Sequence, residues 1–380
     1  MPSSNGESIR ARAIIWIYVW CVAQMASHKR FALKRRYLLI VVGLIAFLFY
    51  LYFFVPFGEV VATVQRANPF YFFLAFCALL GSVVLYALAW QRLLHLLSVK
   101  ASFLKAFQYV WVENFVDLVI PGEPVSGEVS RVYLMSKDTG ANYGKVVASA
   151  VGHRIIATTM TVVGLFASIV YFAIMYKPPL FVLEFAGVVL LGDAIVIGLL
   201  FYLAARKDAT HKLTDWLFNF LTRLSRGRWK FEHLREKAMK MLDMFHEGIL
   251  TLGKHRKGFV LPMLFTAFSW LLDISIAILV FLSLGSIGTE ISLSAIIIAY
   301  SITGAIQYLP IGVIPGEVGL TEIVMTTLFA LLGSPQFIAL FAVATVLIRC
   351  LTFWIKLLIG GTVIQLLGIK SLMPSQTPQP

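Results

Sequence analysis

The sequence predicts an all-α fold class, a polytopic integral membrane helical bundle with about eight membrane segments. Hydrophobic residues make up 59% of its 380 positions and charged residues only 13%, whereas soluble domains are about half apolar and a quarter charged. The mean hydropathy is +0.85. Apolar runs of spanning length alternate with short blocks of Lys and Arg, and two of these runs are broken by similar Pro- and Gly-containing sequences. We therefore expect two broken or re-entrant hairpins among the membrane segments.

The N-terminal segment, residues 1–36, is expected to lie in the cytoplasm. Its apolar stretch 13–26 is too short to span a bilayer, because a helix needs about 20 apolar residues. A basic cluster between His28 and Arg36 then precedes the first span, and Lys and Arg concentrate on the cytoplasmic side of membrane proteins. A start at Met25 is the alternative, in which residues 1–24 are an artefact of start choice.

Residues 37–370 are predicted to form a single transmembrane domain. The expected full spans follow the apolar runs 37–57, 69–90, 155–176, 181–205, 258–284, 293–309 and 336–360. Residues 102–135 are expected to form a re-entrant hairpin, and residues 310–333 a second one, with full crossings as the alternative at both places. The Pro- and Gln-rich end, residues 371–380, is expected to be a disordered tail.

The stretch 206–257 differs in character from the spans on either side of it. It is rich in Lys and Arg, and Trp216, Leu217 and Phe220 recur at helical spacing. This pattern predicts a pair of amphipathic helices at the cytoplasmic membrane surface, where the cations face anionic lipid headgroups. A specific protein partner, such as an envelope-assembly enzyme, is the alternative.

Charge and cysteine usage exclude several function classes. The net charge of +13 lies in short blocks between apolar runs rather than on one soluble face, so we expect no nucleic-acid partner. Cys21, Cys77 and Cys350 are scattered and show no metal-ligand spacing. The sequence has no nucleotide-binding loop and no nucleophile constellation, so we expect no enzymatic activity, no cofactor and no metal.

The two broken segments share one spacing. Pro121 stands six residues before Gly127, Glu128 and Val129, and Pro310 stands six before the same triplet at 316–318. Within a bilayer, broken backbone with carboxylates is tolerated where it is buried in protein or lines a cavity. Paired broken segments indicate a transporter site, so we predict an inverted internal repeat. Chance similarity of two short turns is the alternative.

Charged residues within these apolar runs are the candidates for binding a lipid headgroup, because each costs about 2.5–3.5 kcal/mol at a helix centre. The candidates are Asp117, Glu128, Arg131, His153, Arg154, Glu317 and Glu322. The predicted backbone breaks are Pro121, Gly122, Gly127, Pro310, Pro315, Gly316 and Gly319. A guanidinium suits a phosphate, which makes Arg131 and Arg154 the expected phosphate contacts. The carboxylates would bind a cationic group or exchange protons.

Mutual pairing between helices is the alternative for all these charges. For Asp193, Asp273 and Arg349, each alone on an apolar span, pairing or a position at a helix end is an equal expectation. His153 is expected near a cytoplasmic helix end. Trp270 and Trp354 are expected to face lipid or the membrane interface.

Three runs resemble the lysylphosphatidylglycerol synthase transmembrane-region family, also called flippase-like domain proteins. They are P-G-E-P-V-S-G-E-V-S-R-V-Y-L at 121–134, G-H-R at 152–154 and L-P-I-G-V-I-P-G-E-V-G-L-T-E at 309–322. The positions that match the family pattern are Gly127, Glu128, Arg131, Arg154, Pro310, Gly316, Gly319 and Glu322. His153 stands where an acidic residue often precedes the arginine, and Glu317 replaces a second glycine, so the resemblance does not carry headgroup specificity over.

The resemblance implies a function in lipid movement. In the large aminoacyl-lipid synthases of this family, a soluble transferase domain makes the lipid and the membrane region moves it. This chain shows only the membrane region, so we expect a flippase of the inner membrane that passes a polar-headed or isoprenoid-linked lipid between leaflets. A non-transporting scaffold for an envelope-assembly enzyme is the alternative, and an intramembrane glycosyl or acyl transferase would need a catalytic carboxylate that no spacing indicates.

Overall fold

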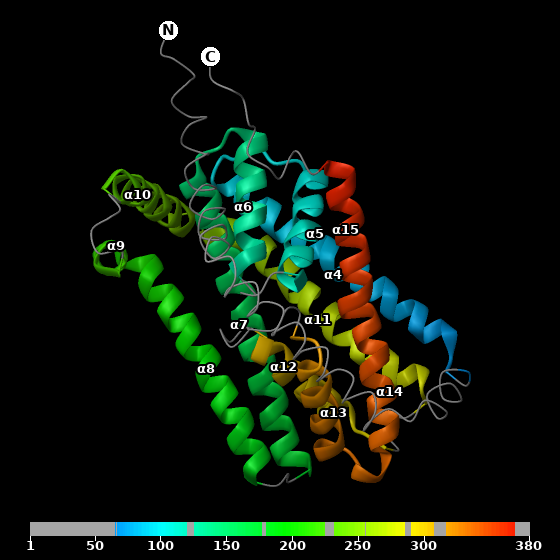
Figure 1. Ribbon diagram of the computed structural model, residues 1–380. Coiled ribbons are helices and arrows are strands. Elements are labelled where there is room, and N and C mark those ends of the chain that lie inside the picture. Colours follow the sequence, from blue (N-terminus) through cyan, green and yellow to red (C-terminus); the bar gives the residue numbers. More distant parts are fainter. Residues whose placement is uncertain are drawn as a thin grey trace.

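The protein folds into an elongated bundle of helices, shown in Figure 1 as a computed structural model. The structure describes residues 65, 67–119, 125–176, 180–224, 232–254, 256–285, 290–307 and 317–368. The predicted all-α class is confirmed. The expected first span 37–57, the tail 371–380 and the breaks at Pro121, Gly122, Pro310, Pro315 and Gly316 lie outside the described residues.

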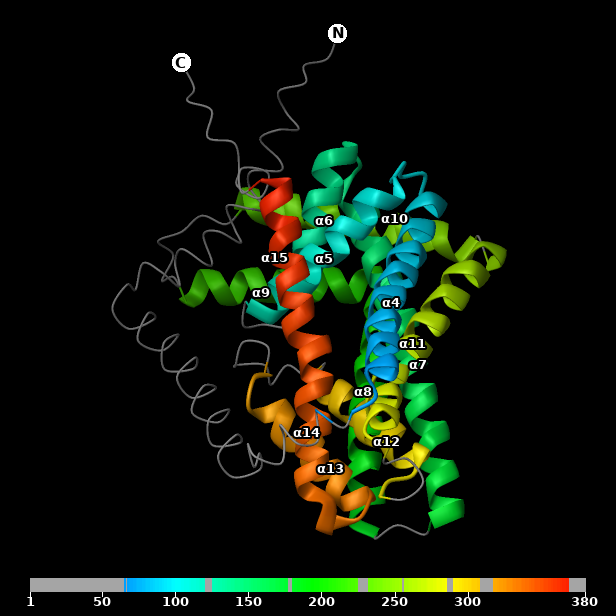
Figure 2. The same cartoon turned by 90° about the vertical axis from the view of Figure 1, so that its right-hand side faces the viewer.

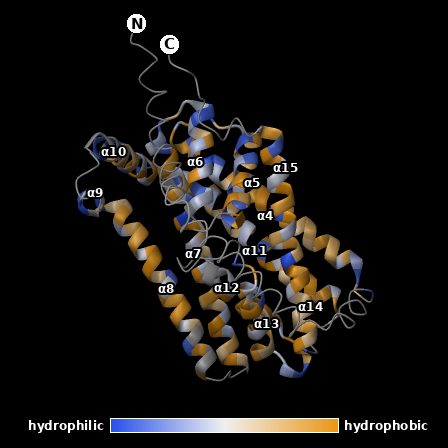
Figure 3. Cartoon of the chain, viewed as in Figure 1, coloured by the Kyte–Doolittle hydropathy of each residue, from blue (hydrophilic) through white to orange (hydrophobic). Residues whose placement is uncertain are grey.

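Five helical segments within the described residues are long and apolar enough to cross a membrane, which confirms a multi-pass membrane protein. They are Pro69–Leu96, Tyr143–Met175, Ala186–Ala205, Lys257–Ser283 and Pro335–Leu367. The helices concerned are α4 (Pro69–Leu96), α7 (Tyr143–Tyr176), α8 (Leu180–Ala205), α11 (Val260–Ser283), and α14 (Ile338–Arg349) continued by α15 (Lys356–Leu367). Hydrophobic residues cover α8 and the lower parts of α7 and α14 in Figure 3.

Helix α4 starts where its sequence provides a cap. The side chain of Asn68 accepts a hydrogen bond from the backbone N–H of Phe70 at 3.0 Å, and Pro69 occupies the first turn, where its missing N–H is not needed. The helix packs most extensively along α11. There the Ser269 hydroxyl donates to the carbonyl oxygen of Ser82 at 2.8 Å, and this bond fixes the two helices in register.

Helix α7 begins at Tyr143, twelve residues before the predicted span 155–176. Asn142 caps it through a bond from the N–H of Gly144 at 2.9 Å. A Cβ at Gly144 would lie 2.5 Å from the Cβ of Met244, so the first turns of α7 pack directly on a neighbouring helix. His153 therefore lies ten residues after the start of α7, and its side chain is fully buried. The prediction that it lies near a helix end was wrong.

Two helices form within the predicted insert 206–257: α9 (Lys207–Leu224) and α10 (Glu232–Lys254). Both lie across the bundle axis in Figure 2. Helix α10 packs against α7, where a Cβ at Gly248 would come within 2.7 Å of the Cβ of Ala148. The insert is thus partly built into the bundle, and its cytoplasmic location stays a prediction.

The two predicted hairpins lie in opposite halves of the bundle. The first consists of α5 (Phe103–Val119) and α6 (Val125–Thr139), in the half that also holds α9 and α10 (Figures 1 and 2). The second, predicted at 310–333, contains α13 (Leu320–Leu332) in the other half, where it contacts α12 (Leu293–Gln307), a helix shorter than the full span predicted at 293–309. These helices of 13 to 17 residues are shorter than the roughly 20 residues of a full crossing. These lengths agree with re-entrant hairpins, and the inverted repeat stays a prediction.

Candidate functional site

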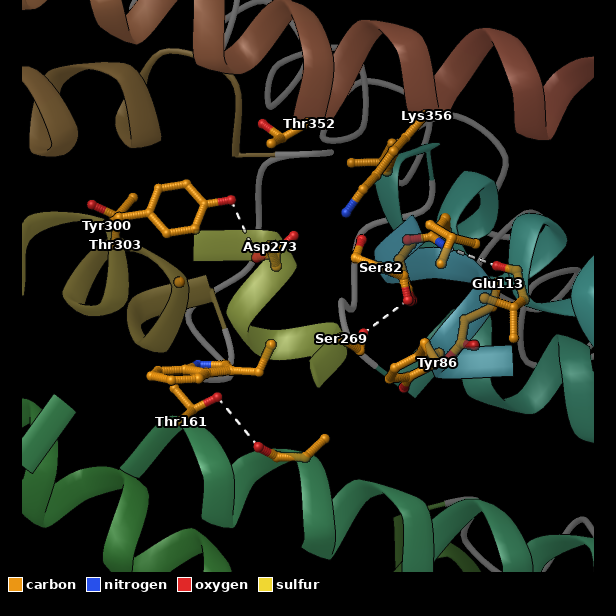
Figure 4. A pocket seen from close by; sticks show the side chains of 18 of the residues that line it. Ser82, Tyr86, Glu113, Thr161, Ser269, Asp273, Tyr300, Thr303, Thr352 and Lys356 are labelled. Atoms are coloured by element: carbon orange, nitrogen blue, oxygen red, sulfur yellow. Dashed lines mark hydrogen bonds between the residues drawn. The ribbon is translucent and has the colours of Figure 1, made fainter. Parts of the chain in front are cut away.

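A cavity of about 260 Å³ is lined by residues of both hairpins (Figure 4). The last turns of α5 contribute Asn114 and Asp117, and the first turns of α13 contribute Thr321 and Met325. Helices α4, α7, α11, α12 and the α14–α15 segment complete the wall. Elements far apart in the sequence thus enclose one polar space inside the apolar bundle.

The first hairpin is held at its break by Asp117. Its Oδ1 accepts hydrogen bonds from the N–H of Gly127 at 2.7 Å and from the hydroxyl of Ser126 at 3.0 Å, which satisfies free donors at the start of α6. A Cβ at Gly127 would lie 2.4 Å from the carbonyl oxygen of Glu113, so only glycine lets α5 and α6 approach so closely. Asp117, a predicted headgroup contact, therefore also caps a helix.

An ion-pair network links the first hairpin to α7. Arg131 is fully buried, and its Nη1 lies 3.0 Å from Oε2 of Glu113 while its Nη2 lies 3.7 Å from Oε1 of Glu128. The same Glu128 oxygen lies 3.3 Å from Nη1 of Arg154. The Arg131 guanidinium also lies over the ring of Trp90, at 4.7 Å.

The two arginines predicted to hold a phosphate are therefore placed differently. Arg154 lines the cavity, and so does Glu113. Arg131 is not part of the cavity wall and pairs with Glu113, which is. A buried arginine requires such a carboxylate partner.

The second hairpin has a tighter arrangement. Gly319 adopts a φ of 90°, which favours glycine, and its N–H donates to Oε2 of Glu322 at 2.6 Å. The other oxygen of Glu322 accepts from Nε of Arg349 at 2.7 Å, and both side chains are about 5% exposed or less. Pairing, one of the two expectations for Arg349, is what the structure shows. Glu317 is buried, with a φ of 48°, and accepts from the hydroxyl of Thr321 at 3.4 Å.

The remaining candidates differ in their relation to this cavity. The ring of His153 stands 4.1 Å from that of Tyr86, a wall residue. Asp193 is buried on α8. Asp273 lines the cavity within α11, away from a helix end, and accepts from the hydroxyl of Tyr300 at 3.2 Å; it forms no ion pair with the residues that the structure describes.

Two wall residues were missed by sequence reasoning. Trp270 was expected to face lipid, but it lines the cavity because Gly164 on α7 leaves space for its ring. Trp354 is 47% exposed, as a lipid-facing residue would be. Lys356 also lines the cavity, directly after a turn of π-helix at Cys350–Ile355, a feature frequent at functional sites. Its signal was a lone lysine inside the apolar run of the last span.

Comparison with known proteins identifies similar chains. The family described as lysylphosphatidylglycerol synthase TM region matches residues 38–360. A UPF0104 membrane protein of Pyrococcus horikoshii is 26% identical over 337 residues, which cover 87% of this chain and 96% of that protein. One from Methanothermobacter thermautotrophicus is 23% identical over 338 residues, 87% of this chain and 95% of its own length. One from Methanocaldococcus jannaschii is 24% identical over 323 residues, 83% and 91% respectively.

Proposed function

The chain belongs to the lysylphosphatidylglycerol synthase TM region family, and from this premise we propose that it moves a polar-headed or isoprenoid-linked lipid between the leaflets of the cell membrane. The observation that carries the proposal is the cavity to which both hairpins contribute. Broken membrane segments that meet at a polar site are characteristic of transporters, because the broken backbone there needs protein or water as its partner.

The geometry supports a path for the headgroup through the bundle and for the acyl chains beside it. Arg154 is 16% exposed and shares its carboxylate, Glu128, with Arg131. It can exchange this contact for a lipid phosphate while Arg131 keeps Glu128 neutralised. The acyl chains would stay against outward apolar side chains such as Leu191 and Ile195 of α8, which are 62% and 61% exposed.

The orientation is part of the proposal. The end of the bundle with α9 and α10 carries basic residues such as Lys207, Lys212 and Lys240. Because cytoplasmic loops are enriched in Lys and Arg, we place this end in the cytoplasm. The first hairpin then enters from the cytoplasm and the second from outside.

Lipid exchange in vesicles tests the function. Purified protein is reconstituted into vesicles that contain a fluorescent phospholipid, and a membrane-impermeant quencher measures how fast label from the inner leaflet reaches the outer leaflet. We expect exchange that the Arg154→Ala variant abolishes. Arg235→Ala is the matched control, since Arg235 pairs with Asp215 on the exposed α9–α10 pair. Failure to accelerate exchange of anionic, aminoacylated and glycosylated lipids alike would contradict the proposal.

One observation favours the scaffold as a second candidate. Helix α9 exposes a row of large apolar side chains, of which Trp216 is 61% exposed and Phe220 49%. Substituting both by Glu would leave lipid exchange in vesicles unchanged. If α9 recruits an envelope-assembly enzyme, this double variant loses function in cells and Arg154→Ala does not. If the protein is a transporter, Arg154→Ala loses function in cells and the double variant does not.

A further inference from the structure

Six hydroxyl groups of the cavity wall donate to backbone carbonyl oxygens. Five donate to a backbone carbonyl three or four residues earlier in their own helix, and one donates across to α4, with donor–acceptor distances of 2.7 to 3.3 Å. The six residues are Ser82, Thr161, Thr266, Ser269, Thr303 and Thr352. A hydroxyl has one hydrogen and two lone pairs, so these groups offer lone pairs to the cavity.

Asn114 adds to this acceptor character. Its amide nitrogen donates to the carbonyl oxygen of Val110 at 2.8 Å, which leaves its side-chain oxygen as an acceptor beside one remaining N–H donor. The acceptors come from six helical segments, α4, α5, α7, α11, α12 and the π-helical turn, and therefore surround the space. A single ammonium concentrates its donors at one point, whereas the hydroxyls of a sugar or polyol are spread out as these acceptors are.

Lys356 gives the cavity a positive charge and hydrogen-bond donors. Arg349 and Arg154, the arginines of the wall, pair with Glu322 and Glu128. In the part of the chain that the structure describes, Lys356 forms neither a hydrogen bond nor an ion pair, and its amino group reaches into the cavity in Figure 4. An ammonium inside a membrane span needs an anion, and lysine binds phosphate as a point charge.

We propose that the cavity selects a lipid whose headgroup joins a phosphate to a hydroxyl-rich group, that is, a glycosyl or polyol phosphate lipid. The phosphate binds Lys356, and the headgroup hydroxyls donate to the acceptors of the wall. Asp273, held by Tyr300, adds one more acceptor on α11. This inference rests on the proposed function and names its substrate class.

Binding of four lipids with identical acyl chains tests the headgroup chemistry. The purified protein in detergent is titrated with phosphatidylinositol, phosphatidic acid, phosphatidylethanolamine and glucosyl diacylglycerol, and native mass spectrometry measures each dissociation constant. We expect phosphatidylinositol to bind at least about tenfold more tightly than each of the others, since each lacks the phosphate or the hydroxyls. Equal binding of phosphatidic acid, or tightest binding of phosphatidylethanolamine, would overturn the proposal.

Three variants assign the roles within the wall. Lys356→Met should weaken phosphatidylinositol about tenfold and leave glucosyl diacylglycerol unchanged, and Lys356→Arg should retain the preference. Thr303→Val should weaken phosphatidylinositol and glucosyl diacylglycerol but not phosphatidic acid. Lys254→Met, at the exposed end of α10, is the matched control. An unchanged lipid preference in Lys356→Met would overturn the phosphate site.

Two further measurements separate this inference from its premise. Soluble inositol phosphate should compete weakly, because the acyl chains contribute to lipid binding; competition at the lipid's own affinity would overturn the lipid as ligand. Lipid exchange in vesicles that shows no dependence on headgroup would defeat the substrate class and leave the flippase standing. A selective binding profile without any exchange would defeat the flippase and leave the binding site.

Discussion

The two hairpins both border the cavity, but they hold their buried carboxylates differently. In the second hairpin, Glu322 and Arg349 form a 2.7 Å pair that is about 5% exposed or less. In the first, Glu128 is 19% exposed and is shared between two arginines at 3.3 and 3.7 Å. A buried, close pair with a second bond to the backbone is rigid, whereas a shared, longer contact exchanges partners readily. We therefore call the second the anchoring hairpin, because its ion pair is rigid. We call the first the working hairpin, because its contacts can exchange for others.

The largest expected effect is on the anchoring hairpin. Glu322→Gln removes the carboxylate that pairs with buried Arg349 at 2.7 Å, and breaking such a buried pair destabilises a protein by about 3–5 kcal/mol. We expect a marked drop in the thermal unfolding temperature of the protein in detergent. Glu128→Gln, which leaves Arg131 its second carboxylate, should lower the unfolding temperature much less. Equal losses in both variants would erase the distinction between the hairpins.

The next effect concerns the close approach of α5 and α6. Gly127→Ala places a Cβ 2.4 Å from the carbonyl oxygen of Glu113, so the hairpin must open. Overpacking of this kind costs about 1–3 kcal/mol, and we expect lipid exchange to fall with it. Gly187→Ala on α8 is the control, because nothing lies within 4 Å of its added Cβ. Normal exchange in Gly127→Ala would show that the hairpin geometry is not required.

A variant of the working hairpin should separate activity from stability. Arg154→Lys keeps the charge but loses the forked donor, so lipid exchange should fall while the unfolding temperature stays nearly unchanged, since the pair with Glu128 is long. Exchange in vesicles and thermal unfolding are measured on the same preparation. A drop in the unfolding temperature comparable to that of Glu322→Gln would show that Arg154 stabilises the fold as Glu322 does.

The smallest effect is expected outside the membrane segments. The hydrogen bond from Lys207 to Asp243, at 2.7 Å, lowers the pKa of this exposed carboxyl. A lowered pKa means that the pair stabilises the α9–α10 junction above the ordinary pKa of Asp, about 4, and loses this contribution as the pH falls through the lowered value. Asp243→Asn should therefore cost under about 1 kcal/mol at pH 7 and leave lipid exchange intact. Lost exchange would assign the junction a role in transport.

Local features made most of the fold predictable. The expected span 181–205 corresponds to α8 at Leu180–Ala205, and α5 and α13 end or begin close to the predicted breaks, because apolar length, proline and glycine act within a few residues. The early start of α7 depends on packing against α10, which lies about a hundred residues away in sequence. A prediction from the length of apolar runs takes no account of contacts between residues so far apart in the sequence.

The site was predictable in kind rather than in detail. The sequence indicated charged residues at the two breaks, because charge in an apolar run is costly wherever the run packs. It did not indicate that Arg131 lies behind Glu113, or that Trp270 and Lys356 line the cavity, because side-chain direction depends on neighbouring helices. The space that Gly164 leaves for Trp270 is a contact between α7 and α11 that no local pattern contains.

Chemical obstruction of the cavity tests the central claim most directly, namely that the lipid headgroup passes between the two hairpins. In a background without Cys21, Cys77 and Cys350, a cysteine replaces Thr303 of the wall, and a charged thiol reagent is attached after reconstitution. A cysteine at Leu191, on the outward face of α8, is the control. We predict that modification at position 303 stops lipid exchange and modification at position 191 does not. Undiminished exchange with the cavity obstructed would contradict the account.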